Sequence, residues 1–175
     1  MIDDIDIPED LKGDLIPEID PQKLFDENEY STIIVGAEGM TKKDSHNVDY
    51  LTVLLSKAST REEKDEALIN LKENKAQEFI IGAISKSKNL AQKARLVAVC
   101  WETGLDFSKD YLFFINLICD ADFLVAFEAY TVISEMMVDT DEAVLDTALK
   151  ILKKQSNPSV AVTDAILLIE QKLEN

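Results

Sequence analysis

The sequence predicts an all-α protein of about four stacked antiparallel helix pairs, preceded by an irregular acidic N-terminal arm. From residue 44 onward, apolar residues recur every three to four positions, and almost no strand-like segment lies between these stretches. Four similar segments are centred on alanines that lie 27, 35 and 36 residues apart: Ala67, Ala94, Ala129 and Ala165. A period of about 33 residues is typical of helix-pair repeats.

The acidic arm is expected over residues 1–43, ahead of a helical-repeat domain over residues 44–175. Residues 1–29 contain eleven Asp or Glu and two Lys, and three prolines in this stretch interrupt any long helix. Nine large apolar residues alternate with the carboxylates. This pattern leaves three interpretations open, namely packing against the helical body, ordering on a partner, and disorder. A short β-prone segment is expected near residues 31–36.

The first four helices follow from apolar faces and start signals. The first carries an apolar face over residues 50–55, and Thr60 with Glu63 predicts a capping box at the start of the second. The third is centred on residues 79–84. The fourth is expected to begin after Asn89 and to end at Gly104, a typical C-terminal breaker.

The last four helices are expected to begin at polar residues that precede apolar runs. The fifth and sixth helices are apolar nearly all round, whereas the first pair is polar, which indicates central pairs buried on both sides and polar terminal pairs. The expected start residues are Ser108, Asp120 or Asp122, Asp139 or Thr140, and Asn157 followed by Pro158 at the first helical position.

The net charge of −16 arises from 34 acidic and 18 basic residues. Such a charge repels phosphate, so neither a nucleic acid nor an anionic membrane is expected as a partner, whereas a basic protein would be attracted. The chain begins without the basic end and apolar run of a signal peptide, and no apolar segment approaches the roughly 20 residues of a membrane span. A cytoplasmic location is therefore predicted.

No residue pattern predicts catalysis, a metal or a cofactor. The one histidine, His46, lies in a polar turn, and Cys100 and Cys119 lie in apolar runs where they are expected to be buried. Trp101, next to Cys100, is likewise expected in the core. The acidic pairs at residues 120 and 122 and at 139 and 141 stand at helix starts, where negative charge stabilises the helix dipole.

The helix-pair period, the Ala-centred second helices and the short capped turns resemble the HEAT and armadillo group of α-solenoids over about residues 44–175. The proline and the Asp/Arg ladder of strong HEAT repeats are missing here. The resemblance implies a curved stack whose second helices line a concave, protein-binding surface. On the fourth and sixth helices, the outward stripe is then expected at Gln92, Arg95, Glu102, Glu128, Thr131 and Glu135.

The function expected from this resemblance is that of a non-catalytic scaffold or adaptor that binds another protein. The alternative is an acidic inhibitor or immunity-type protein that neutralises a basic nuclease or toxin, which would associate in a strongly salt-dependent manner. A third interpretation, an enzyme on a helical-repeat frame, requires a polar pocket with a perturbed carboxylate. The sequence does not indicate an oligomeric state.

Overall fold

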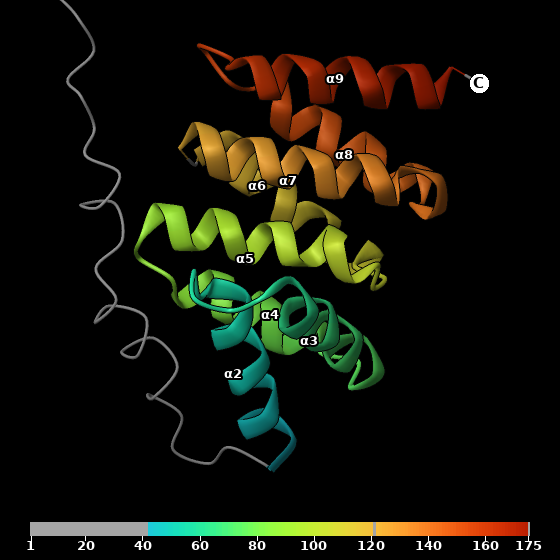
Figure 1. Ribbon diagram of the computed structural model, residues 1–175. Coiled ribbons are helices and arrows are strands. Elements are labelled where there is room, and N and C mark those ends of the chain that lie inside the picture. Colours follow the sequence, from blue (N-terminus) through green and yellow to red (C-terminus); the bar gives the residue numbers. More distant parts are fainter. Residues whose placement is uncertain (1–41, 121, 175) are drawn as a thin grey trace, which may run out of the picture.

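The computed structural model describes residues 42–120 and 122–174, and these residues form helices and short connections without any strand. The predicted acidic arm and its β-prone segment near residues 31–36 lie outside the described residues. Figure 1 shows the helices as successive layers. They are α2 (Lys42–Leu55), α3 (Arg61–Glu73), α4 (Gln77–Lys86), α5 (Leu90–Thr103), α6 (Tyr111–Asp120), α7 (Phe123–Met136), α8 (Glu142–Leu152) and α9 (Val160–Leu173), with the short 3-10 helices η3 (Ser108–Asp110) and η4 (Met137–Asp139).

Helices adjacent in the sequence pack as pairs: α2 with α3, α4 with α5, α6 with α7, and α8 with α9. The second helices of these pairs also pack on one another, α3 on α5, α5 on α7 and α7 on α9. Figure 1 shows α5, α7 and α9 lying side by side. The all-α prediction is therefore confirmed, and α5 and α7 lie at the middle of this row.

The four aligned alanines are buried positions on the second helices of the four pairs. Ala67, Ala94, Ala129 and Ala165 lie on α3, α5, α7 and α9, and each is at most 7% exposed. A methyl side chain at such a position lets two helices approach closely, since interaxial distance depends on the side chains at the contact. The sequence repeat thus corresponds to one buried alanine on the second helix of each pair.

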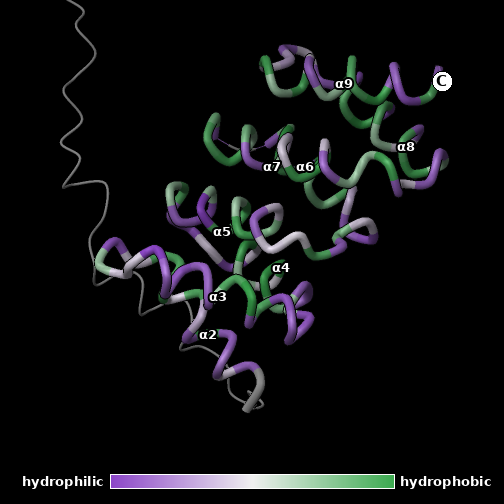
Figure 2. Tube along the Cα trace, turned by 45° about the vertical axis from the view of Figure 1, so that its right-hand side comes forward, coloured by the Kyte–Doolittle hydropathy of each residue, from purple (hydrophilic) through white to green (hydrophobic). Residues whose placement is uncertain are grey.

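The core runs without interruption through the described helices, from Leu51 on α2 to Ile169 on α9. At its centre, the ring of Phe114 meets those of Phe107 and Phe113 edge to face, with centroids 6.0 and 5.4 Å apart. Burial of one large apolar side chain stabilises a fold by about 1.5–3 kcal/mol. The helices differ in how many residues they bury: α5 buries eight of its fourteen residues, and α3 buries only two of its thirteen. Figure 2 shows the same contrast, with long hydrophilic stretches on α2 and α3.

Several predicted helix ends are confirmed. Thr60 and Glu63 form the capping box, with Glu63 N donating to Thr60 Oγ1 at 3.2 Å and Thr60 N donating to Glu63 Oε2 at 2.7 Å. Asn89 Oδ1 caps α5 by accepting from Gln92 N at 3.0 Å. Gly104 ends α5 with φ +58°, a left-handed conformation that favours glycine.

Of the two aspartates expected at the start of α7, Asp122 is the cap, since its carboxylate accepts from Leu124 N at 3.0 Å. The prediction for Ser108 is wrong. This residue opens η3, one turn before α6, and its backbone N–H donates to Asp106 Oδ1 at 2.9 Å. The 3-10 turn inserted between the loop and α6 removes the need for a serine cap there.

The predicted starts of the last two helices are also shifted. Asp141, and not Asp139 or Thr140, caps α8 by accepting from Ala143 N at 2.8 Å. Asp139 instead ends η4, which continues directly from α7. Helix α9 begins after Ser159, whose hydroxyl accepts from Val162 N at 3.3 Å, two residues beyond the predicted Asn157 cap. Each stretch contains several residues able to cap.

None of the described helices has the length and apolar character needed to cross a lipid bilayer.

Candidate protein-interaction face

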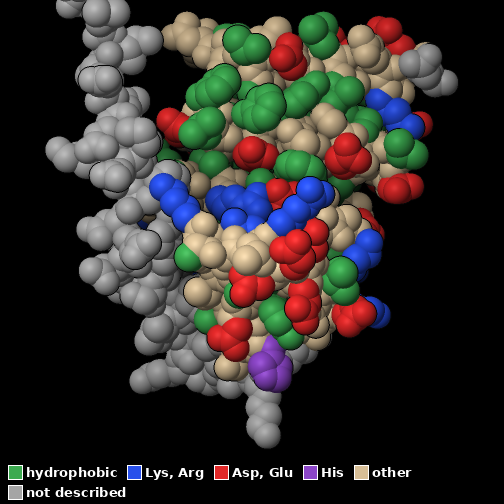
Figure 3. Space-filling view, in the orientation of Figure 1, with side chains coloured by type: hydrophobic (Ala, Val, Ile, Leu, Met, Phe, Trp, Pro, Cys, Tyr) green, Lys and Arg blue, Asp and Glu red, His purple; other side chains and the backbone are tan. Residues whose placement is uncertain are grey.

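The second helices α3, α5 and α7 share an exposed face, on which Lys and Arg side chains form a row over α5 and most of the hydrophobic side chains lie above that row (Figure 3). Between α3 and α5 lies a depression of about 500 Å³, which we call the α3–α5 groove. Next to it, exposed apolar side chains at the start of α7 form what we call the α7 apolar patch. The groove is lined by Ser59, Arg61, Lys64, Asp65, Leu68, Arg95, Trp101 and Glu102. The patch consists of Phe123, Leu124 and Phe127.

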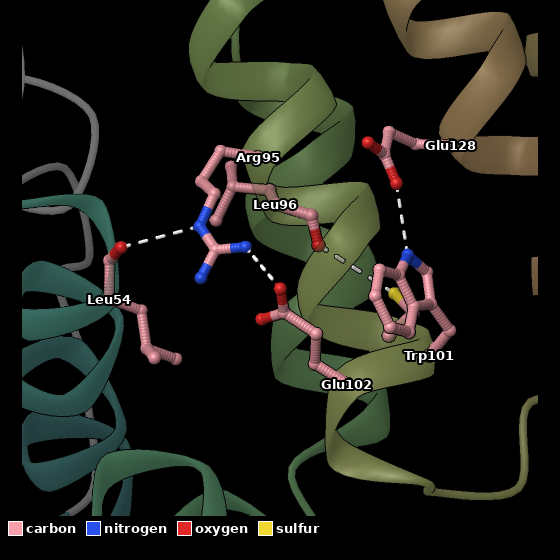
Figure 4. A network of polar contacts seen from close by, with 7 residues as sticks. Leu54, Arg95, Leu96, Trp101, Glu102 and Glu128 are labelled. Atoms are coloured by element: carbon pink, nitrogen blue, oxygen red, sulfur yellow. Dashed lines mark hydrogen bonds and ion pairs between the residues drawn. The ribbon is translucent and has the colours of Figure 1, made fainter. Parts of the chain in front are cut away.

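Arg95 anchors the centre of the groove. Its Nη1 donates to Glu102 Oε1, two turns further along α5, and its Nε donates to the backbone carbonyl of Leu54 at 3.4 Å (Figure 4). The side chain of Arg95 is 35% exposed and that of Glu102 is 20% exposed. Because Leu54 belongs to α2, the guanidinium joins the first helix pair to α5. One edge of the guanidinium remains available at the surface.

Glu102 presents one oxygen that the fold leaves unsatisfied. While Oε1 accepts from Arg95, Oε2 is buried and has no hydrogen-bond partner among the described residues. A buried acceptor without a donor costs about 1–3 kcal/mol. The Glu102 carboxylate therefore lowers the stability of the fold unless its second oxygen finds a donor.

Trp101 lies between the groove and the α7 apolar patch. Its Nε1 donates to Glu128 Oε2 on α7 at 2.9 Å, and the side chain is 41% exposed (Figure 4). The prediction that Trp101 lies in the core is therefore wrong. Its neighbour Cys100 points into the core and is fully buried, whereas the next position along the helix turns outward. The Trp101 side chain, which belongs to α5 and is hydrogen-bonded to α7, therefore lies at the surface where the two helices meet.

The predicted stripe is only partly outward-facing. Gln92 was expected on the surface but is 2% exposed, because its side chain turns toward the α4–α5 connection, where Oε1 accepts from the Ser87 hydroxyl at 3.3 Å. Arg95 and Glu102 lie together in the groove, and Glu128 meets Trp101 instead of another member of the stripe.

The two remaining members of the stripe lie further along α7. Thr131 is half-buried, and its hydroxyl donates within the helix to the carbonyl of Phe127 at 3.2 Å. Glu135 is exposed and lines a separate cavity. The stripe is therefore not continuous, and of its six members only Arg95 and Glu102 line the groove.

The α7 apolar patch differs from the expectation that α7 is buried on both sides. Phe123, Leu124 and Phe127 are 68%, 54% and 53% exposed, and the rings of the two phenylalanines stack with centroids 6.4 Å apart. Their spacing of four residues places both phenylalanines on one side of α7, away from the buried stripe that begins at Val125 and Ala126. The same spacing is typical of a buried helix face, so the sequence alone does not identify the patch. Contiguous exposed apolar surface of this kind marks interaction sites.

The second cavity, of about 260 Å³, lies where the C-terminal ends of α5 and α7 meet. Cys100, Glu135 and Asp139 are among its lining residues. Burial raises the pKa of the Cys100 thiol well above its ordinary range, and the thiol therefore stays protonated and unreactive. The described residues contain no cluster of three or more His, Cys, Asp or Glu side chains that could hold a metal ion.

Two carboxylates beside η3 have shifted titrations with opposite signs. Backbone and side-chain hydrogen bonds from Ser108, helped by Lys109, lower the pKa of Asp106. Burial raises the pKa of Asp110, and the Glu78 carboxylate adds to that shift. Neither residue lines the α3–α5 groove.

The face as a whole offers apolar contact area and an ion pair, which are elements of recognition. Comparison of this chain with known protein families, with curated proteins and with solved structures found no match in any of the three.

Proposed function

We propose that the chain is a non-catalytic scaffold of the α-solenoid type that binds another protein across the exposed face of α3, α5 and α7. The observation that carries this proposal is Trp101, a large aromatic side chain that is 41% exposed and is held by Glu128 between the groove and the apolar patch. Tryptophan is enriched among the residues that dominate protein–protein affinity. The packing of each second helix on the next supports the repeat-type interpretation.

The α7 apolar patch supplies the energetic reason for a partner. Complete burial of one Phe or Leu side chain is worth about 1.5–3 kcal/mol, and each 1.4 kcal/mol changes affinity about tenfold. Phe123, Leu124 and Phe127 are each more than half exposed, so most of that gain is still available for binding. A partner that covers this patch would gain affinity because binding buries apolar surface that folding leaves exposed.

The charged groups around Trp101 would determine the orientation in which a partner binds. Arg95, Glu102 and Glu128 are fixed by hydrogen bonds before a partner arrives, and little side-chain entropy is then lost on binding. Fixed charges at the edge of an apolar contact favour partners with complementary charge and disfavour others. The arrangement suits specific recognition of one surface.

An acidic inhibitor of a basic nuclease or toxin is the second candidate. It is favoured by the run of exposed carboxylates on α3, which includes Glu62, Glu63, Asp65 and Glu66, together with the net charge of −16. In that case charge would dominate the contact and the α7 apolar patch would contribute little. Binding would then weaken steeply as ionic strength rises.

The test is affinity capture from cells that express the protein, with the full chain as bait at low and at high salt. Trp101→Ala and Phe127→Ala are compared with Val138→Ala, a control at a residue 76% exposed beyond the end of α7. We expect one partner that the wild-type chain and the control retain at both salt concentrations and that the two face variants lose. Equal retention by all four baits contradicts the proposed face. A basic partner that high salt releases from every bait favours the inhibitor.

A further inference from the structure

Trp101 lines two concavities, the α3–α5 groove and the cavity of about 260 Å³ at the C-terminal ends of α5 and α7. The cavity reaches into the core, because Phe107 and Val132 in its lining are each 1% exposed, whereas Trp101 is 41% exposed. Its volume lies below the range of about 300–1,000 Å³ that is typical of small-molecule sites. A hollow of this size beside an exposed tryptophan suits the insertion of a single side chain from a partner.

The charged side chains that line the cavity are all acidic. They are Asp106, Glu135 and Asp139, each of them exposed, and no Lys, Arg or His is among the described residues that line it. Asp106 accepts a hydrogen bond from the Ser108 N–H at 2.9 Å. None of the ion pairs among the described residues involves these three carboxylates. Glu135 and Asp139 are four residues apart, so they lie on the same side of the chain as α7 runs into η4.

The helix ends beside the cavity add to its negative potential. A helix carries a partial negative charge at its C-terminal end, which a lysine or arginine in the last turn offsets. Among the second helices, α3 and α9 have a lysine in the last turn, Lys72 and Lys172. Helices α5 and α7 have no basic residue there, and Glu135 lies in the last turn of α7. The cavity thus opens between two helix ends whose own last turns supply no cation.

Two lysines approach this region without lining the cavity. The Nζ of Lys72 lies 3.4 Å from the position that a β-carbon on Gly104 would occupy, and Lys109 acts electrostatically on Asp106. Both lysines are exposed. Neither forms an ion pair with Glu135 or Asp139 in the described part of the chain. A cation from outside the chain would therefore find these two carboxylates available.

We propose that this cavity receives an arginine side chain of the protein partner, with the guanidinium directed to Glu135 and Asp139 and stacked on Trp101. The aliphatic stem of the arginine would lie on Val132 and Met136. Arginine suits the site better than lysine, because its guanidinium is planar, is weakly hydrated and stacks on aromatic rings. Arginine is also enriched among the residues that dominate protein–protein affinity. This inference rests on the proposed function, since it names the group by which the partner would be held.

Titration of the full chain with N-acetyl-arginine amide tests the cavity directly, because Trp101 is the only tryptophan and reports through its fluorescence. We expect a saturable change with a Kd of millimolar order, as befits so small a ligand. N-acetyl-citrulline amide, a neutral probe of the same shape, should bind at least about tenfold more weakly, since it lacks the charge-assisted hydrogen bonds. Equal binding of the two probes, or no saturable response to the arginine amide, overturns the proposal.

A carboxylate variant locates the binding of this probe. In Glu135→Gln/Asp139→Asn we expect the affinity for the arginine amide to fall about fivefold or more. Glu142→Gln/Asp146→Asn on α8 removes the same number of charges and should bind like the wild type. All four positions are exposed, so both variants should fold. Equal affinity of the two variants shows that the probe binds elsewhere and overturns the proposal.

Partner capture separates this inference from the proposed function. With the Glu135→Gln/Asp139→Asn chain as bait, we expect recovery of the partner to fall about fivefold or more relative to the Glu142→Gln/Asp146→Asn bait. If the carboxylate variant retains in full a partner that Phe127→Ala loses, the arginine site is wrong and the proposed function stands. If the wild-type bait captures no partner, the proposed function itself fails.

Discussion

The indole N–H of Trp101 donates to the Glu128 carboxylate at 2.9 Å and thereby joins α5 to α7 at the protein surface. The two residues are 27 positions apart in the sequence and lie on consecutive second helices. This bond restricts the rotation of the tryptophan side chain while much of its ring remains exposed. An aromatic side chain fixed in this way is prepared for a partner, because less freedom is lost on binding.

Replacement of Glu128 tests whether the hydrogen bond that orients the Trp101 ring matters for binding, because the ring itself is kept. Glu128→Ala removes the acceptor, and we expect partner capture to fall several-fold while the free energy of unfolding changes by less than about 1 kcal/mol, because the hydrogen bond is exposed. Glu128→Gln keeps an acceptor oxygen and should bind nearly as the wild type. Urea unfolding and quantitative capture measure the two effects. A loss of stability well above this bound would assign Glu128 a structural role instead.

The Arg95–Glu102 pair is expected to contribute to stability because both side chains are largely withdrawn from solvent. Arg95→Met leaves the Glu102 carboxylate without its donor, which should lower the free energy of unfolding by about 1–3 kcal/mol. The double variant Arg95→Met/Glu102→Met should lose less than the sum of the single variants, since it leaves no unpaired charge. Lys93→Met on the same helix is the matched control, with an expected change within about 0.5 kcal/mol. Additivity of the two single effects would show that the residues act independently.

Enlargement of an aligned alanine should separate the second helices. Ala129 is fully buried on α7, a helix that packs against α5, α6 and α9. We expect Ala129→Leu to destabilise the protein by about 1–3 kcal/mol through overpacking, as measured by urea unfolding. Ala143→Leu, at an exposed position of α8, should change stability by no more than about 0.5 kcal/mol. Equal effects at both positions would argue against close packing at Ala129.

Asp110, in η3, and Asp106, just before it, are expected to make contributions to stability that depend on pH in opposite ways. Since burial raises the pKa of Asp110 in the folded state, protonation favours folding there, and the stability linked to this residue falls as pH rises above the ordinary carboxyl range. Asp110→Asn should therefore stabilise the protein at pH 7 relative to the wild type, and the gain should disappear below about pH 3.5, where both states hold the proton.

Asp106 is expected to behave in the opposite way. Hydrogen bonds from Ser108 lower its pKa, and its contribution to stability is present above the ordinary carboxyl pKa and lost as pH falls through the lowered value. Asp106→Asn should destabilise the protein at pH 7 and have little effect at about pH 2, a pH below the ordinary carboxyl range. Thermal unfolding of both variants from pH 2 to 7 measures the two trends. Parallel curves for the two variants would contradict the assigned causes.

The two thiols should differ in accessibility. Cys100 is fully buried, whereas Cys119 is half-buried, contrary to the expectation that both are buried. Burial and the neighbouring Asp120 raise the pKa of Cys119 as well, and its reaction at neutral pH should be slow. We expect one thiol per chain to react with a maleimide under native conditions and two in urea. Cys119→Ser should abolish the native reaction, and rapid labelling of Cys100 in that variant would contradict its burial.

Local signals in the sequence were sufficient for some features of the fold. The capping box at Thr60, the cap at Asn89 and the break at Gly104 depend on residues within one turn, and each is confirmed. The alanine repeat likewise identified positions where helices touch, because a small residue at a fixed period reflects packing between neighbours.

The features that were missed depend on contacts between distant segments. The 3.6-residue period assigns Gln92 to the same side of α5 as Arg95, but the α4–α5 connection covers it. Trp101 and Phe127 are apolar residues in apolar helices, and only the position of the neighbouring layers leaves them exposed. A single sequence does not record which side of a helix a neighbour covers, so the candidate site could be predicted only in part.

The uneven burial of α3 and α5 has a consequence for the motions of the groove. Amide hydrogens exchange with solvent most slowly where the most buried contacts must be broken, and α5 buries eight residues against two on α3. Helix α5, which carries Arg95 and Trp101, is therefore the more deeply embedded of the two helices. Because the two helices form opposite walls of the groove, we expect slower amide exchange along the α5 wall than along the α3 wall.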